Sequence, residues 1–484
     1  NCVTDDLYEE AMQAAKVAQA RYRDGTARPL EGLPISVKDC LKQRGVDSTC
    51  GLADKCNNPA TEDGPVVGIL RAAGAIPFVR TNTPQGLLAP ESMNYIFGTT
   101  TNPYNPKRSA GGSSGGEAAL IALGGSLMGI GSDIGGSIRI PAHFCGILGF
   151  KPSPLRFSRK GMVVPRSTPY AGQEHIKPVF GPMARTVDDL VLMLEAWLAP
   201  SNPMRDADPH CPPVPWNSAV YTDTKPLTVG YYTTDDWFAA APACQRAVLE
   251  AVEALEKTGV KCVRFDPPDV TKVCAVLLFY AILSSDGGAG VFDGMNGEKV
   301  HPMYAKIVQM VETPQWVKAI LRRVMGVVGQ RRLSMMLKYL GPKSTEALWE
   351  VLKARDRYQD EFVAAWRASG IDLLVGPGLG IPAFPHLGST DTTPALSPTF
   401  LWNLLHFPAG TVPVTLTRAD EVKYEPPVGQ RDMLGKAAAA QVATSEGLPI
   451  GVQVIALPFQ DEVAVRGMKM LSEALPPAPT PPAQ

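Results

Sequence analysis

Stretches of helical and of strand character alternate along most of the chain. Six stretches have the composition of helices, at residues 5–23, 65–73, 186–198, 244–258, 356–369 and 462–475. Short apolar runs predict strands at residues 33–37, 75–79, 260–265, 371–375 and 448–457. Strands separated by helices pair in mixed or parallel sheets. The pattern therefore predicts an α/β protein with a mixed, twisted sheet that helices cover on both faces.

Residues at the ends of several helices support these boundaries. The stretch 5–23 begins with acidic and ends with basic residues, which suits the helix dipole. Pro65 and Gly74 are typical start and stop residues for the second helix. Thr186 followed by Asp189 resembles a capping box. Residues 199–226 are rich in proline and polar residues, so we expect a long surface connection between two halves of the chain.

Composition adds a few limits to this picture. Lys and Arg number 46 against 47 Asp and Glu, so the net charge of -1 gives no reason to expect a nucleic-acid partner. Charged residues at 19% and hydrophobic residues at 45% are typical of a globular chain. We expect one catalytic domain over residues 1–475 and a disordered tail over residues 476–484, which read PPAPTPPAQ.

Three features bear on where the protein works. The nine cysteines form no Cys-x-x-Cys pair, which favours reduced thiols and a cytosolic or cytosol-facing protein. The sequence contains no run of about 18 uninterrupted apolar residues, so no membrane-spanning helix is predicted in it. No signal peptide is recognisable, but the chain starts at Asn1 rather than Met, so an upstream segment could be missing.

A glycine- and serine-rich region carries the candidate chemistry. It contains the units Gly111-Gly112-Ser113 and Gly135-Gly136-Ser137. Glycine allows backbone N–H groups to converge on a small space, where they can stabilise an oxyanion during acyl transfer. A serine next to such groups is placed to attack a carbonyl carbon.

Other interpretations of this region were weighed. Glycine-rich turns that only allow close packing would explain one such unit better than two. A phosphate-binding loop requires Gly-Lys-Ser/Thr, whereas Glu117 follows the glycines here and would repel a phosphate. A nucleophile elbow over residues 111–115 must follow a strand, but residues 105–109 are polar and contain a proline.

The region resembles the amidase signature family. Residues 111–153 are similar to its Ser/Gly-rich signature, and residues 32–39 (GLPISVKD) are similar to its lysine motif. The resemblance covers nearly the whole chain. Further matching stretches are residues 76–82, 181–185, 229–235, 285–288, 407–415 and 447–458.

The resemblance implies specific roles for residues of this chain. It implies that Lys38 is the base, Ser113 a bridging serine with a cis peptide bond, and Ser137 the acylated nucleophile. It also implies that Leu87 contacts the substrate, although residues 85–90 differ from the family pattern in vertebrates. We expect Ser114, Asp133 and Arg139 to support these groups rather than to act as catalysts. The expected substrate and oxyanion contacts lie in one segment of the chain: Ile134, Gly135, Gly136 and Ser137.

These residue types suit amide hydrolysis without a metal or cofactor. A serine needs a base to take its proton, and lysine can be that base only when burial keeps it neutral. Ser113 can relay the proton because its hydroxyl both donates and accepts. The six histidines share no pattern with these residues, and for His143, near Ser137, a packing role is favoured over a catalytic one. No spacing predicts a metal site.

Residues 306–340, the cap segment, mix apolar and basic side chains. Trp316, Ile320 and Val324 alternate with arginines, and Glu312 is the only acid in the segment. A basic amphipathic helix with a tryptophan can lie in a membrane interface, or it can pack on the core or a partner subunit. The resemblance favours a membrane-binding cap, because family members that hydrolyse fatty acid amides have one in this region.

The resemblance thus predicts a serine hydrolase of fatty acid amides, namely N-acylethanolamines and primary fatty amides. It also implies a homodimer associated with an endomembrane and facing the cytosol. Two alternatives remain. One is an amidase with another substrate class, such as the amidase subunit of a tRNA-dependent amidotransferase. The other is a non-catalytic binding protein on the same fold, which would be expected to lose Lys38, Ser113 or Ser137.

Overall fold

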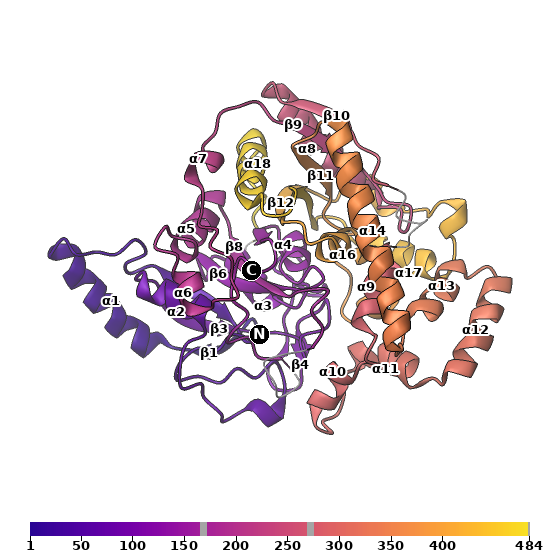
Figure 1. Ribbon diagram of the computed structural model, residues 1–484, viewed down its shortest axis with the longest axis horizontal. Helices are drawn as coiled ribbons and strands as arrows, with labels where there is room; N and C mark the ends of the chain where they lie inside the picture. Colours follow the sequence, from indigo (N-terminus) through magenta and orange to yellow (C-terminus); the bar gives the residue numbers. More distant parts are fainter. Residues whose placement is uncertain (165–171, 269–274, 483–484) are drawn as a thin grey trace.

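A computed structural model describes residues 1–164, 172–268 and 275–482 of the chain. Within these residues eleven strands form one sheet (Figure 1). In spatial order they are β1 (Val3–Asp6), β3 (Ile76–Thr81), β2 (Pro34–Lys38), β6 (Met128–Asp133), β8 (Val179–Ala184), β7 (Leu148–Lys151), β12 (Ala409–Leu416), β13 (Pro449–Ile455), β11 (Leu373–Pro377), β9 (Thr228–Tyr231) and β10 (Lys261–Arg264). A separate antiparallel pair is formed by β4 (Met93–Asn94) and β5 (Gly98–Thr99).

The sheet is mixed, as predicted. Strand β2 runs parallel to β3 and β6, and β9 runs parallel to β10 and β11. The central strands from β6 to β13 pair antiparallel. Because β2 and β6 are parallel neighbours, their carboxyl ends lie at the same edge of the sheet, where α/β proteins commonly bind ligands.

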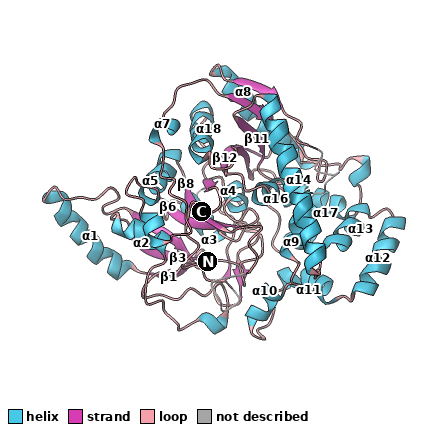
Figure 2. Cartoon of the chain, in the orientation of Figure 1, coloured by secondary structure: helices cyan, strands magenta, loops and turns pink. Residues whose placement is uncertain are grey.

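Helices cover both faces of the sheet (Figure 2). Successive residues of a strand point to opposite faces. On β12, Gly410 faces Met468 of α18 (Asp461–Ala474), whereas the Thr411 hydroxyl donates to the Arg139 carbonyl of α4 (Arg139–Cys145) at 3.4 Å. The two helices therefore lie on opposite sides of β12, and the predicted α/β class is confirmed.

All six predicted helices are present, five of them with small changes at their ends. They are α1 (Tyr8–Arg23), α2 (Pro65–Ala72), α5 (Val187–Trp197), α8 (Pro242–Lys257) and α14 (Thr345–Ser369), besides α18. The Thr186 hydroxyl accepts from the Asp189 N–H at 3.1 Å, so the predicted cap of α5 is confirmed. Helix α14 begins eleven residues earlier than predicted, because Ser344 caps it by accepting from the Ala347 N–H at 3.2 Å.

The remaining helices lie in connections and around the sheet. The connection over residues 199–226 contains α6 (Pro203–Ala207) and α7 (Ser218–Tyr221). The others are α3 (Gly115–Ala122), α9 (Ala275–Leu283), α10 (Ala289–Phe292), α15 (Ser389–Thr392), α16 (Ser397–Leu404) and α17 (Met433–Val442). In the tail, the carbonyl of Pro479 accepts a hydrogen bond from the Tyr104 hydroxyl. The last two tail residues, 483 and 484, lie outside the described residues.

The cap segment folds into three helices. They are α11 (Ala305–Glu312), α12 (Gln315–Val327) and α13 (Arg331–Tyr339), in the lower right part of Figure 1. Pro314 precedes the first residue of α12, and Gly329 has a φ of +77°, so the chain turns at both points. None of the helices in the described ranges is long and apolar enough to cross a membrane.

Candidate active site

Lys38 ends β2 and lies completely buried, with none of its surface exposed to solvent. Its amine donates to three serine hydroxyls: Ser113 at 2.7 Å, Ser114 at 2.9 Å and Ser132 at 2.8 Å. No acidic side chain among the described residues forms an ion pair with this amine. The site therefore surrounds a lysine with neutral oxygen partners.

The surroundings of Lys38 favour its neutral form. Burial lowers the pKa of the amine, because the ammonium loses its hydration and gains no carboxylate contact. Three hydroxyls remain adaptable partners, since each can donate or accept as the lysine gains or loses a proton. A buried lysine with neutral oxygen partners is able to act as a base.

Ser113 and Ser114 lie immediately before α3 and are both buried. The Gly112–Ser113 peptide bond is cis, as the family resemblance implies. The preceding glycines are required by the packing. Gly111 has a φ of +85°, and a Cβ atom there would lie 2.7 Å from the Pro141 Cα. Close backbone contact at Gly111 holds Ser113 beside the lysine.

Ser137 lies in the loop between β6 and α4 and is only partly buried. Its carbonyl accepts from the Ser114 N–H at 3.1 Å, which joins this loop to the start of α3. Its hydroxyl has no hydrogen bond within the described part of the chain, and that includes Ser113. Ser137 is thus the serine of the site that a substrate can approach.

The N–H groups of residues 134–137 differ from one another in availability. The Gly136 N–H donates to Asp133 Oδ1 at 2.8 Å, so it is occupied here. The N–H groups of Ile134, Gly135 and Ser137 have no partner among the described residues. Gly136 has a φ of +113°, and a Cβ atom there would lie 2.4 Å from the Thr399 hydroxyl, so only glycine fits.

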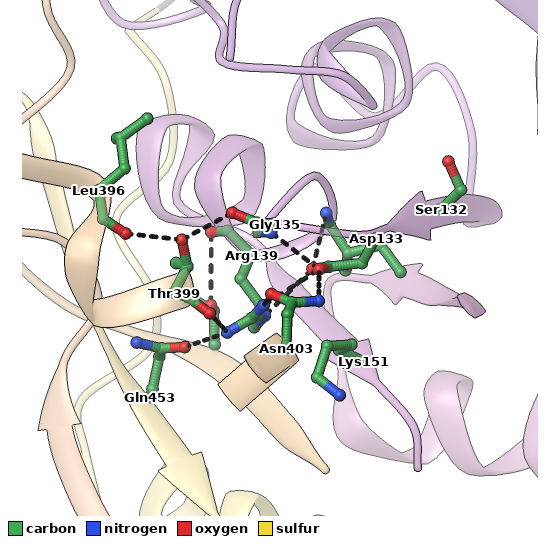
Figure 3. A network of polar contacts seen from close by, with 12 residues as sticks. Ser132, Asp133, Gly135, Arg139, Lys151, Leu396, Thr399, Asn403 and Gln453 are labelled. Carbon is green, nitrogen blue, oxygen red and sulfur yellow. Dashed lines mark hydrogen bonds and ion pairs between the residues drawn. The ribbon is translucent and has the colours of Figure 1, made fainter. Parts of the chain in front are cut away.

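Asp133 and Arg139 form a buried network beneath this loop (Figure 3). The Asp133 carboxylate accepts from the Arg139 guanidinium twice at 3.0 Å, and from the Ile138 N–H at 3.2 Å. Arg139 also donates to Asn403 at 2.6 Å and to Gln453 at 2.7 Å. Burial alone would raise the pKa of Asp133, but the Arg139 charge outweighs it and holds the pKa at about 2. These two residues shape the loop and do not face the lysine.

Leu87 lies in a loop of unusual backbone conformation. Its φ is +66°, a region that a branched side chain rarely adopts. The loop is held by Gln85, whose side chain donates to the Lys299 carbonyl at 3.1 Å and accepts from the His301 N–H at 2.8 Å. The Tyr304 hydroxyl also donates to the Gln85 carbonyl at 2.5 Å. The loop therefore contacts the chain just before the cap segment.

Sequence reasoning missed two contributors to the site. Ser132 contacts Lys38, yet it was not singled out, although it directly precedes Asp133 in the signature. Gln85 was noted only as part of a divergent block.

His143 is completely buried on α4, and burial lowers its pKa to about 4. Its Nδ1 accepts from the Gly451 N–H at 3.1 Å, consistent with a packing role.

Comparison with known proteins places this arrangement in a family. The chain is 39% identical over 483 residues to fatty-acid amide hydrolase 1 of Sus scrofa, covering 99% of this chain and 81% of that protein. It is 38% identical over 477 residues to fatty acid amide hydrolase 1 of Caenorhabditis elegans, covering 98% of this chain and 82% of that protein.

A solved structure agrees with these relatives. The structure of a fatty acid amide hydrolase superposes with a TM-score of 0.80 at 28% identity, over 98% of this chain and 79% of that chain. The amidase family profile matches residues 1–465. The chain therefore belongs to the amidase family.

Proposed function

We propose that this chain hydrolyses fatty acid amides through an acyl-enzyme on Ser137. The observation that carries the proposal is the buried Lys38 amine, hydrogen-bonded to serine hydroxyls and to no carboxylate. In such a site the lysine amine is neutral before the reaction and can accept a proton from a serine hydroxyl. The two relatives named above are fatty acid amide hydrolases, which supports fatty acid amides as the substrate class. Within that class, the family resemblance leads us to propose N-acylethanolamines and primary fatty amides.

The reaction begins with a proton relay. Lys38 takes the hydroxyl proton of Ser113 while Ser113 takes that of Ser137. The freed Ser137 oxygen bonds to the amide carbon, and the carbonyl oxygen becomes an oxyanion. The N–H groups of Ile134, Gly135 and Ser137 support this charge, since none of them has another partner in the described ranges of the chain. Gly136 joins them only if its N–H leaves Asp133.

The second half of the reaction returns the protons. The carbon–nitrogen bond breaks as the proton held by Lys38 passes through Ser113 to the leaving nitrogen. Water then attacks the Ser137 ester and gives its proton to the same relay. The carboxylic acid leaves, and Ser137 regains its proton. Apart from the amide and this water, every group in the proposed cycle belongs to the chain.

An exposed apolar stripe on α12 supports a lipid substrate. Trp316, Ile320 and Val324 lie four residues apart on one side of the helix, with 69%, 51% and 47% of their surfaces exposed. Lys318, between them in sequence, is 2% exposed and points inward. We propose that the cap segment binds a membrane surface through this stripe and receives the lipid amide there.

The cap segment is proposed as part of one catalytic domain over residues 1–475. By its likeness to the family, the protein is further proposed to act as a homodimer on a cytosol-facing endomembrane. Sedimentation equilibrium in detergent would test the dimer. Fluorescence imaging of the tagged chain after selective permeabilisation would test the location and the side of the membrane.

The central test concerns Ser137. Purified protein is assayed on long-chain fatty acid amides, on short aliphatic amides and on glutamine-type amides. We expect hydrolysis of the first group, and loss of both hydrolysis and fluorophosphonate labelling in Ser137→Ala. The exposed Ser218→Ala serves as the matched control and keeps full activity. Activity in Ser137→Ala would refute the nucleophile, and a preference for glutamine-type amides would refute the substrate class.

Membrane binding is tested separately with liposomes. We expect Trp316→Glu combined with Ile320→Glu to abolish co-sedimentation, because two charges then replace the centre of the apolar stripe. Leu249→Glu on α8 is the control, since Leu249 is 51% exposed but lies outside the cap segment. Unchanged co-sedimentation of the double variant would contradict the membrane role.

A further inference from the structure

A buried carboxylate lies beside Lys38 and has no part in the mechanism above. Glu117 is in the first turn of α3, three residues after Ser114, and none of its surface is exposed. The Ser36 hydroxyl donates to its Oε2 at 2.5 Å, and the Thr81 hydroxyl donates to its Oε1 at 2.8 Å. Both oxygens are thus held by neutral donors.

The surrounding strands leave a specific space for this carboxylate. Ser36 and Lys38 are two residues apart on β2 and point to the same face, and Thr81 on β3 is the register partner of Lys38. On the other neighbour of β2, a Cβ atom at Gly129 would lie 2.0 Å from Glu117 Oε2. Glycine at this position therefore makes room for the carboxylate next to the strand that carries the lysine.

Glu117 has no cation of its own. Within the described residues it forms no ion pair, and the positive charges that act on it are those of Lys38 and Arg80. Arg80 is already paired with Asp39 at 3.1 Å. The lysine is therefore the unpaired cationic group that a Glu117 carboxylate can influence.

The other titratable groups around this pair are accounted for. Asp133 also acts on Lys38, but it is paired with Arg139. Burial raises the pKa of the thiols near the pair, so these thiols are neutral at physiological pH. They are Cys2, Cys40 and Cys50.

We propose that Glu117 is a positioning residue for the lysine base. Its carboxylate joins the start of α3 to β2 and β3, and its negative charge acts on the Lys38 amine. The proposal rests on the proposed function in one respect, that Lys38 is the base. The hydrogen bonds to Ser36 and Thr81 hold the helix turn that follows Ser113 and Ser114, so Glu117 also holds these serines against the amine.

The sign of the electrostatic effect follows from the charges. A Glu117 carboxylate favours the ammonium form of Lys38 and raises the pH at which the amine becomes neutral. Burial raises the pKa of Glu117 to about 7 and lowers the pKa of Lys38, so the pKa values of the two groups move toward each other. Removing the carboxylate should therefore extend activity to lower pH.

The test compares pH profiles of Glu117→Gln and the unchanged protein. We expect the acid limb of kcat/KM to move down by about one pH unit, the low end of what a nearby opposite charge produces. Relative to its own plateau, the variant then gains up to about tenfold at the acid end. Glu462→Gln is the matched control, because Glu462 is also a buried carboxylate but pairs with Arg156 at 2.9 Å, away from Lys38.

Fluorophosphonate labelling of Ser137 over the same pH range gives a second readout that needs no amide substrate. If labelling shifts while no amide is hydrolysed, the substrate class fails and the role of Glu117 stands. If the unchanged protein hydrolyses amides and neither profile shifts in Glu117→Gln, the role of Glu117 is refuted. Should Glu117→Gln fail to fold, Ser36→Ala replaces it, because loss of a donor favours the neutral carboxyl and shifts the limb in the same direction.

Discussion

Replacing Asp133 by Asn removes the negative charge on which the loop of Ser137 depends. The carboxylate accepts from the backbone N–H groups of Gly136 and Ile138 and from the Arg139 guanidinium. In Asp133→Asn the buried Arg139 charge has no counter-ion, and the new amide cannot accept at both of its ends. We expect a loop that no longer holds its N–H groups in one direction.

The cost can be worked out from the burial of the pair. Both side chains are fully buried, and breaking such a pair costs about 3–5 kcal/mol. An unfolding entropy of about 2.1 cal/mol/K per residue gives about 1 kcal/mol/K for a chain of 484 residues. The expected loss in Tm is therefore about 3–5 °C. Misplacing a loop that supports the oxyanion should lower kcat by about 10² or more.

Acid stability gives an independent check on the same charge. The pKa of Asp133 is about 2 in the folded chain, below its ordinary value of 3.8. A depressed pKa adds stability that is complete above the unfolded value and is lost as the pH falls toward the folded one. The difference is worth about 2 kcal/mol between roughly pH 4 and pH 2. Asp133→Asn should show a flatter decline of stability in that range.

The assays are thermal unfolding by circular dichroism and steady-state amide hydrolysis. Asp266→Asn is the matched control, because its ion pair with Arg264 lies on the surface and is worth little. A variant with normal Tm and normal kcat would refute the reasoning. A lowered Tm with unchanged kcat would show that the network stabilises the fold without shaping the oxyanion loop.

Three further predictions concern single side chains. Lys38→Ala should lose about 10²–10⁴ in kcat/KM at neutral pH and regain activity steeply at high pH. The exposed Lys353→Ala is the control and should keep the activity of the unchanged protein. A pH profile of Lys38→Ala equal to that of the unchanged protein would contradict the base role. Ser132→Ala should lose about tenfold in kcat/KM and Ser132→Thr much less, because threonine keeps the hydroxyl that contacts Lys38. Equal losses of kcat/KM in the two variants would mean that the hydroxyl is unimportant. Gln85→Ala should raise KM for long-chain amides more than for short ones, because the loop of Leu87 loses both side-chain contacts to residues 299–301. A series of amides of increasing chain length measures this effect. Equal changes in KM for long and short amides would argue against a role in acyl binding.

Local patterns explain which parts of the fold the sequence could predict. The ends of α2 and α5 follow from Pro65 and Thr186, because capping depends only on neighbouring residues. The extra length of α14 was missed because its first turns lie before the stretch with clear helical composition. The cap segment was predicted only as basic and amphipathic, and its division into three helices was not predicted, although Pro314 and Gly329 mark the points where the chain turns.

The candidate site shows a similar division. Lys38 and Ser113 could be named from motifs, and the structure places them 2.7 Å apart. Ser132 could not be named, because its contact with Lys38 depends on the register of two neighbouring strands. The partners of Arg139 were equally hidden, since Asn403 and Gln453 follow it by 264 and 314 residues. A single sequence has no local signal for contacts over such distances.

Those distant partners of Arg139 have a consequence for the order of folding. The loop that carries Ser137 is braced by α16 and β13, which the chain contributes only in its last quarter. Contacts between residues far apart in sequence form slowly, because the intervening chain must first be ordered. During synthesis, the loop of Ser137 therefore gains these contacts only after β13 has joined the sheet. In a nascent chain, the proposed catalytic loop therefore lacks these supports until α16 and β13 have been synthesised and have packed against it.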